Sequence, residues 1–161
     1  MRFISQNPAD TRRIGAELGA ALGVGGAVIS LSGALGAGKT LFTKALAGAL
    51  GLDERLVASP TFVIAGEYAL LRAGSPGRLV HVDFYRVESE AELEDAGLDD
   101  WLAEGTVLVA EWGERFPFAL PEDRLDVRIA SGELPESRIM EAEARGPRSR
   151  ALLERWSSRW R

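Results

Sequence analysis

The glycine-rich segment "GALGAGKT", residues 33–40, constrains the fold more than any other, and it directly follows the apolar run "AVISL". It matches the pattern G-x-x-x-x-G-K-[ST], which requires a strand before it and a helix after it. In such a loop, consecutive backbone N–H groups turn toward one anion, and the following helix adds the positive end of its dipole. The segment, called the glycine loop below, therefore predicts a phosphate-binding turn between a strand and a helix.

The glycine loop supplies two side chains that suit a nucleotide with magnesium. Lys39 is expected to reach the outer phosphates, and the hydroxyl of Thr40 is expected to bind Mg²⁺. Of the 19 basic residues only Lys39 and Lys44 are lysine, and a compact ammonium suits a tight phosphate site better than a planar guanidinium. The other loop positions expected to contact the nucleotide are Gly33, Leu35, Gly36, Ala37 and Gly38.

The rest of the chain alternates strand and helix patterns, which predicts a single small α/β domain with a P-loop NTPase fold. Strand patterns cover residues 2–7, 25–33, 59–71 after an initial loop, 78–87, 106–112, 124–130 and 137–144, and helical patterns cover 8–23, 39–51, 88–105 and 148–160. We expect a mostly parallel sheet with antiparallel edge strands. Residues 1–144 would form the nucleotide-binding domain, and residues 145–161 a basic helix packed on or appended to it.

Two apolar runs each end in one carboxylate, "LVHVD" at Asp83 and "VLVAE" at Glu111. Both acids are expected beside the glycine loop, because the carboxyl ends of parallel strands meet at one edge of a sheet. A phosphate site needs acids to hold Mg²⁺ and to position water. One acid would bind Mg²⁺, directly or through water, and the other would orient the attacking water. The alternative is that one of them caps a loop or pairs with Arg86 or Arg115.

His81 is the single histidine of the chain, and it alternates with Asp83 and Tyr85 on one strand face. A packed, hydrogen-bonded histidine is favoured here over a catalytic base. With one histidine and no cysteine, the chain has neither a multi-histidine nor a thiolate metal site. The segment "SPTF", residues 59–62, lies where many P-loop hydrolases have a loop that senses the γ-phosphate, and its chemistry fits a switch or a structural turn equally.

The net charge of −5 is uneven, because residues 145–161 carry six arginines and one acid while the first 144 residues carry −10. An acidic body argues against a protein that grips nucleic acid alone. The tail also has an apolar stripe, which favours a helix docked on the domain over a contact with nucleic acid or an acidic partner; its members are Leu152, Leu153, Trp156 and Trp160. The acidic segment 88–105 is interpreted as a solvated face, with a partner contact as the alternative.

Targeting signals are absent from the sequence patterns. No apolar run approaches membrane-spanning length, and the N-terminus lacks the basic-then-apolar pattern of a secretory signal. We therefore expect a cytoplasmic protein with no membrane partner.

Four segments together resemble one family. "GALGAGKT", "SPTF", "HVDFYR" and "EW" followed by "LPEDRLDV" are similar, in order and spacing, to the bacterial TsaE (YjeE) family, the ATPases of tRNA threonylcarbamoyladenosine biosynthesis. The resemblance runs from about Thr11 to the strand that holds Arg138. It implies a P-loop domain that hydrolyses ATP with Mg²⁺ and works with TsaB and TsaD. TsaD transfers the threonylcarbamoyl group to an adenosine beside the tRNA anticodon, and the implied TsaE role is to reset that complex between turnovers.

The resemblance also assigns roles to individual residues. Lys39 matches the P-loop lysine and Thr40 the Mg²⁺-binding hydroxyl. Asp83 matches an aspartate important for hydrolysis, and Glu111 matches a glutamate of the Mg²⁺ shell, so these three oxygen-bearing side chains form the implied metal site. Trp112 matches the tryptophan near the nucleotide, and Thr61 matches the threonine of the switch-like loop. Arg138 matches an arginine near the nucleotide. The arginine-rich tail after Arg145 departs from the family pattern.

Two other functions fit a glycine loop of this kind. A small-molecule or nucleoside kinase would usually carry a lid with arginines, whereas the segment between Asp83 and Glu111 is acidic and would repel phosphates. A nucleotide-binding regulator would switch without meaningful hydrolysis. A phosphorylated acceptor would identify the kinase, and slow turnover insensitive to partners would identify the regulator.

Overall fold

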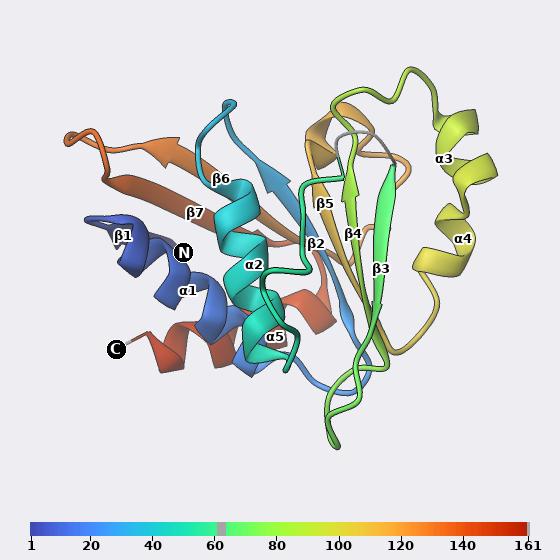
Figure 1. Cartoon of the computed structure of the whole chain (residues 1–161), viewed down its shortest axis with the longest axis horizontal. Coiled ribbons are helices and arrows are strands. Elements are labelled where there is room, and N and C mark those ends of the chain that lie inside the picture. Colours follow the sequence, from blue (N-terminus) through green and yellow to red (C-terminus); the bar gives the residue numbers. More distant parts are fainter. Residues whose placement is uncertain (61–63, 161) are drawn as a thin grey trace.

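A seven-stranded sheet of order β1-β7-β6-β2-β5-β4-β3 forms the centre of the computed structural model, which describes residues 1–60 and 64–160. The strands are β1 (Arg2–Ser5), β2 (Ala27–Ser32), β3 (Ala65–Ala69), β4 (Arg78–Asp83), β5 (Thr106–Glu111), β6 (Leu125–Ser131) and β7 (Arg138–Ala144). Strands β6, β2, β5 and β4 run parallel, and β1, β7 and β3 form antiparallel pairs toward the two edges (Figure 1). The predicted α/β fold, parallel at its centre and antiparallel at its edges, is confirmed.

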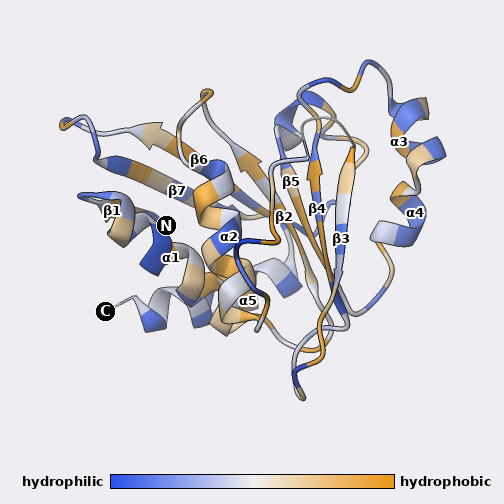
Figure 2. Ribbon diagram, in the orientation of Figure 1, coloured by the Kyte–Doolittle hydropathy of each residue, from blue (hydrophilic) through white to orange (hydrophobic). Residues whose placement is uncertain are grey.

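The helices divide between the two faces of the sheet. The α-helices are α1 (Pro8–Ala21), α2 (Lys39–Ala49), α3 (Glu90–Ala96), α4 (Leu98–Trp101) and α5 (Pro147–Arg159), and a 3-10 turn, η1, spans Gly113–Arg115. One apolar core joins α1, α2 and α5 to the sheet, and a second joins α3 and α4 to the other face of β4 and β5. Figure 2 shows the central strands as largely apolar, as two-sided burial requires. No helix within the described residues is long and apolar enough to cross a membrane.

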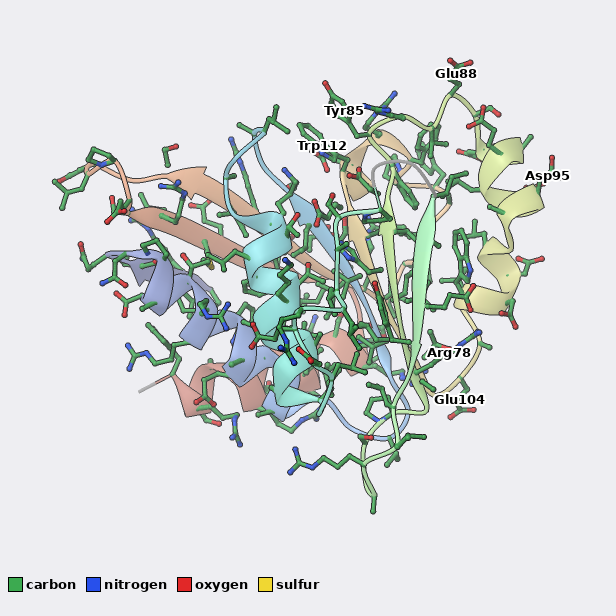
Figure 3. The ribbon with its side chains drawn as sticks, viewed as in Figure 1. Arg78, Tyr85, Glu88, Asp95, Glu104 and Trp112 are labelled. Carbon is green, nitrogen blue, oxygen red and sulfur yellow. The ribbon has the colours of Figure 1, made fainter. Side chains whose placement is uncertain are left out.

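The acidic segment differs from the prediction of one helix over residues 88–105. It forms two short helices, α3 and α4, because Gly97 between them adopts a left-handed conformation with φ +111°. Leu93, Leu98 and Trp101 are buried against the sheet. Glu88 and Asp95 point away from the sheet (Figure 3). The break lets both helices turn their apolar sides to the core and their acids to solvent.

The C-terminal helix α5 is docked on α1 through aromatic side chains. Trp156 is fully buried, stacks on Phe3 with ring centroids 4.2 Å apart, and donates its Nε1–H to the carbonyl of Ile14 at 3.0 Å. Four arginines of the tail bond within the chain: Arg145 to Asp126, Arg148 to the carbonyl of Gly25, Arg155 to that of Ala21, and Arg159 to Glu17. These contacts support the docked interpretation of the tail.

Asp123 anchors the start of α5 from a neighbouring loop. Its carboxylate accepts hydrogen bonds from the backbone N–H groups of Arg148 and Ser149, both at 2.9 Å. Slight burial raises the pKa of Asp123, but these N–H bonds outweigh it and hold the pKa below its usual value. The ionised carboxylate therefore stabilises the fold, and this contribution is lost as the pH falls through that lowered pKa.

Replacing Asp123 with alanine is expected to lower the free energy of unfolding by about 1 kcal/mol at neutral pH, the usual contribution of a helix cap. Chemical denaturation between pH 7 and pH 3 measures it. The difference between the variant and the wild type is expected to shrink below about pH 4, the ordinary range of an aspartate pKa. Glu122→Ala removes a neighbouring exposed carboxylate and is the control. An equal loss of stability in both variants would contradict the capping role.

Candidate functional site

The register of the parallel strands brings the two predicted acids together. Asp83 at the end of β4 lies opposite Glu111 at the end of β5, and Glu111 lies opposite Leu31 of β2. The strand β2 leads directly into the glycine loop, so all three strands end at the edge that carries the loop. This is the edge at which open α/β sheets bind ligands.

The backbone of the glycine loop has the unusual conformation that its glycines permit. Gly33, Gly36 and Gly38 have φ values of +143°, +77° and +106°, and α2 begins at the next residue, Lys39. A Cβ atom at Gly33 would lie 2.3 Å from the carbonyl oxygen of Ile129, whereas one at Gly36 would meet nothing within 4 Å. Gly33 is therefore required both for its φ angle and for its close approach to β6.

Substituting Gly33 with alanine is expected to destabilise the protein by about 1–3 kcal/mol or more, because backbone strain adds to a clash with a carbonyl that cannot easily move. Gly36→Ala is the matched variant, since it imposes a left-handed φ in open space and is expected to cost about 1 kcal/mol. The free energies of unfolding of both variants test the difference. Equal losses would show that the contact with β6 does not constrain the loop.

Lys39 lies inside the curve of the glycine loop. Its Nζ donates to the carbonyl oxygens of Gly33 at 2.8 Å and Ala34 at 3.1 Å, and it lies 4.3 Å from the ring centroid of Trp112. The side chain is buried, with 5% of the residue exposed. An ammonium at this position can exchange carbonyl partners for phosphate oxygens without leaving the loop.

Glu111 connects the strand ends to the start of α2. Its Oε1 accepts a hydrogen bond from the hydroxyl of Thr40 at 3.1 Å and lies 2.8 Å from Nε2 of His81. The residue is 3% exposed, so this carboxylate is almost removed from bulk water. Glu111 and Thr40, both expected at the metal site, are thus in direct contact.

Asp83 is half-buried beside Glu111. Burial raises the pKa of Asp83, the backbone N–H of Tyr85 opposes this by donating to Oδ1 at 2.9 Å, and the charge of Glu111 adds to the rise. Asp83 therefore carries a carboxylate whose charge is unfavourable until a cation or a hydrogen-bond donor compensates it. Strand β4 ends at Asp83, earlier than the predicted residue 87, and the turn directs Tyr85 toward Trp112.

Trp112 follows Glu111 in a strained backbone conformation. With φ +59°, it is the only non-glycine residue of the described chain with a positive φ. Its ring lies 5.1 Å from that of Tyr85, and Figure 3 shows both at the end of the sheet opposite Arg78 and Glu104. Backbone strain of this kind persists where the surroundings fix it, and it is frequent at functional sites.

These residues surround a cavity of about 380 Å³ above the strand ends. Its lining includes the loop residues Leu35, Gly36, Gly38, Lys39 and Thr40, together with Ser59, Asp83, Tyr85, Arg86, Glu111 and Trp112. Leu35 is 84% exposed and forms part of the rim. Eight of the twelve site residues predicted from the sequence therefore lie together around one cavity.

The other predicted site residues lie behind the cavity or outside the described part of the chain. Gly33 and Ala37 line the opposite side of the loop, where the guanidinium Nε of Arg138 donates to the carbonyl of Ala37 at 3.0 Å. Arg138 also donates through Nη1 to the carbonyl oxygens of Pro135 and Ser137. It thus supports the loop, and a direct contact with a nucleotide stays a prediction. Thr61 lies outside the described residues.

The donor set suits a hard cation that keeps several waters. Within the described residues, no group of three or more acidic or histidine side chains surrounds a point that a metal ion would fill. The site instead offers two carboxylates and a hydroxyl, from Asp83, Glu111 and Thr40. Mg²⁺ commonly binds through one or two protein oxygens together with waters and phosphate oxygens, so these residues fit it.

His81 is the residue whose place in the site the sequence analysis underestimated. It is fully buried and bonded as expected, but its partner is the candidate metal ligand Glu111. The signal lay in the strand spacing, because His81 and Glu111 occupy the same face of neighbouring strands, offset by two residues in the register. The position of Glu111 relative to His81 depends on that register, which the sequence does not give.

Comparison with known proteins gives consistent matches along most of the chain. Residues 5–140 match the family model described as threonylcarbamoyl adenosine biosynthesis protein TsaE. The tRNA threonylcarbamoyladenosine biosynthesis protein TsaE of Streptomyces coelicolor is 43% identical over 150 residues, which cover 91% of this chain and 94% of the relative. The protein of the same name from Bacillus subtilis is 41% identical over 131 residues, covering 80% of this chain and 77% of the relative.

A solved structure extends this similarity to the whole fold. The crystal structure of YdiB from Bacillus subtilis superposes with a TM-score of 0.78 at 34% sequence identity. The match covers 100% of this chain and 96% of that chain. The overall fold is therefore shared with a structure of nearly the same length.

Proposed function

Because the chain belongs to the TsaE family of tRNA threonylcarbamoyladenosine biosynthesis, we propose that it is a Mg²⁺-dependent ATPase that assists the tRNA-modifying complex of TsaB and TsaD. Hydrolysis would reset that complex between turnovers, and the transfer to tRNA would be carried out by the complex itself. The protein would meet tRNA through its partners, in the cytoplasm. Participation in tRNA modification follows from the family, and the residues of the site support the proposed ATP hydrolysis.

One observation carries the hydrolase assignment: Asp83 and Glu111 lie side by side at the strand ends, next to the lysine and the hydroxyl of the glycine loop. The loop N–H groups and Lys39 would hold the β- and γ-phosphates by charge-assisted hydrogen bonds. Thr40 and Glu111 would hold Mg²⁺, which neutralises charge on the phosphate oxygens when bound. Asp83 would orient the attacking water as a hydrogen-bond acceptor. Its raised pKa makes its carboxylate a stronger base than an ordinary aspartate.

The residues around the cavity and the acidic helices favour water over a second substrate as the acceptor. Tyr85 and Trp112 pack against each other at the edge of the cavity with tilted rings, and Leu35 forms its rim. The helices that follow β4 carry acids on their outer faces, which would repel a phosphorylated or anionic acceptor. These features support hydrolysis over phosphoryl transfer to a small molecule.

Phosphate release from ATP and Mg²⁺ tests the proposal, measured with the protein alone and with TsaB and TsaD. We expect slow release by the protein alone and faster release with the partners. Release that is indifferent to the partners would contradict the accessory role. A phosphorylated small molecule in place of free phosphate would identify a kinase, and binding without turnover in either condition would identify a regulator.

A further inference from the structure

Among the described residues, the side chain of His81 makes one hydrogen bond, and that bond goes to the candidate metal ligand. Its side chain is fully buried, and its Nε2 lies 2.8 Å from Oε1 of Glu111. Its Nδ1 is a buried nitrogen with no hydrogen-bond partner among the described residues. On this face of the sheet its neighbours Leu79 and Val109 are apolar, and Asp83, two residues further along β4, is acidic. Burying a polar ring in such surroundings costs free energy, which the hydrogen bond to Glu111 offsets only in part.

The geometry fixes which atom donates. A carboxylate can only accept hydrogen bonds, so the two neighbours of Glu111 Oε1 must both be donors. The hydroxyl of Thr40 donates one bond, and Nε2–H of His81 donates the other. Nε2 therefore carries a proton, and Nδ1 has no hydrogen-bond partner among the described residues.

Both bonds go to the same oxygen of Glu111, which determines what the other oxygen can do. Oε2 makes no hydrogen bond with the described residues, and Glu111 lines the cavity. A carboxylate held at Oε1 from two directions cannot rotate freely about its terminal torsion. Oε2 is thus left available to an incoming ligand in a fixed orientation.

We propose that His81 is a positioning residue, whose Nε2–H holds the Glu111 carboxylate so that Oε2 is presented to the Mg²⁺ ion of the nucleotide site. This inference rests on the proposed function, because it assigns His81 to the same metal. Partners that orient a metal ligand in this way typically change metal affinity by about 10–100-fold when they are removed. His81 contacts neither the nucleotide nor the metal in this scheme, and it acts only through Glu111.

Three substitutions of His81 separate positioning from packing. His81→Leu fills a similar space without a donor, His81→Gln carries an N–H at about the reach of Nε2, and His81→Asn carries one that is too short. Calorimetric binding of ADP is measured in EDTA and across a Mg²⁺ titration, together with the Mg²⁺ dependence of ATP hydrolysis. Thermal melting of each variant reports on folding.

We expect His81→Leu and His81→Asn to raise the Mg²⁺ concentration at half-saturation by about 10-fold or more, with ADP binding in EDTA unchanged. His81→Gln is expected to restore most of this loss. An unchanged Mg²⁺ midpoint in His81→Leu and His81→Asn, or an equal shift in all three variants, would overturn the proposal. If His81→Leu does not fold, the comparison of Gln with Asn still decides between these outcomes.

Measurements on the wild-type protein separate a failure of the proposed Mg²⁺-dependent ATPase function from a failure of the positioning role of His81. If its binding of ADP and its hydrolysis of ATP do not depend on Mg²⁺, the proposed function fails and the role of His81 fails with it. If the wild type depends on Mg²⁺ and the midpoint does not move in His81→Leu or His81→Asn, only the positioning role is overturned.

Discussion

Replacing Lys39 with alanine is expected to weaken ATP binding by about 100-fold and to reduce phosphate release below detection. The side chain is already inside the glycine loop, where Nζ bonds to the carbonyls of Gly33 and Ala34. Each charge-assisted hydrogen bond contributes roughly 1.5–3 kcal/mol, and tenfold in affinity corresponds to about 1.4 kcal/mol. Calorimetric titration with ATP and Mg²⁺ measures the affinity, and a phosphate assay measures turnover.

Lys44→Ala provides a matched control, because Lys44 is the only other lysine of the chain. It lies on the same helix, α2, but it lines a different hollow, beside Arg12 and Glu54. Its removal is expected to leave binding and turnover within about twofold of the wild type, as for a surface substitution away from the site. Comparable losses in the two variants would mean that the helix, and not the ammonium of Lys39, supports the activity.

Replacing Asp83 with asparagine is expected to lower phosphate release by about 100- to 1,000-fold, the usual effect of removing one group that acts on the transition state. The same substitution is expected not to lower the melting temperature of the free protein. Burial raises the pKa of Asp83 and Glu111 adds to the rise, so at neutral pH the ionised carboxylate is unfavourable in the folded state. A neutral amide of the same shape removes that cost.

Two measurements on Asp83→Asn decide the assignment: phosphate release with saturating ATP and Mg²⁺, and thermal melting without ligand. Asp99→Asn is the control, because Asp99 is an exposed acid on α4, outside the cavity lining. Near-normal release by Asp83→Asn would remove Asp83 from the hydrolytic machinery. A marked fall in its melting temperature would show that the carboxylate is structural.

Much of the architecture is encoded locally and was predictable from the sequence. The apolar run before residue 33 and the glycine pattern require a strand, a turn and a helix in that order, because few other conformations satisfy the positive φ values at these glycines. The endings of β4 at Asp83 and β5 at Glu111 were likewise visible as apolar runs that stop at a carboxylate. The break at Gly97 was missed, since a glycine within an acidic amphipathic pattern is compatible with both a continuous and an interrupted helix.

The sequence by itself determined the fold class, the glycine loop and the identity of the acids, because each depends on residues that are close along the chain. The tertiary structure alone decided their arrangement. Strand register placed Asp83 opposite Glu111 and brought His81 within 2.8 Å of the same carboxylate, and the antiparallel return of β7 carried Arg138 to the back of the loop. Register and strand order are set by packing between distant segments, so no local pattern specifies them.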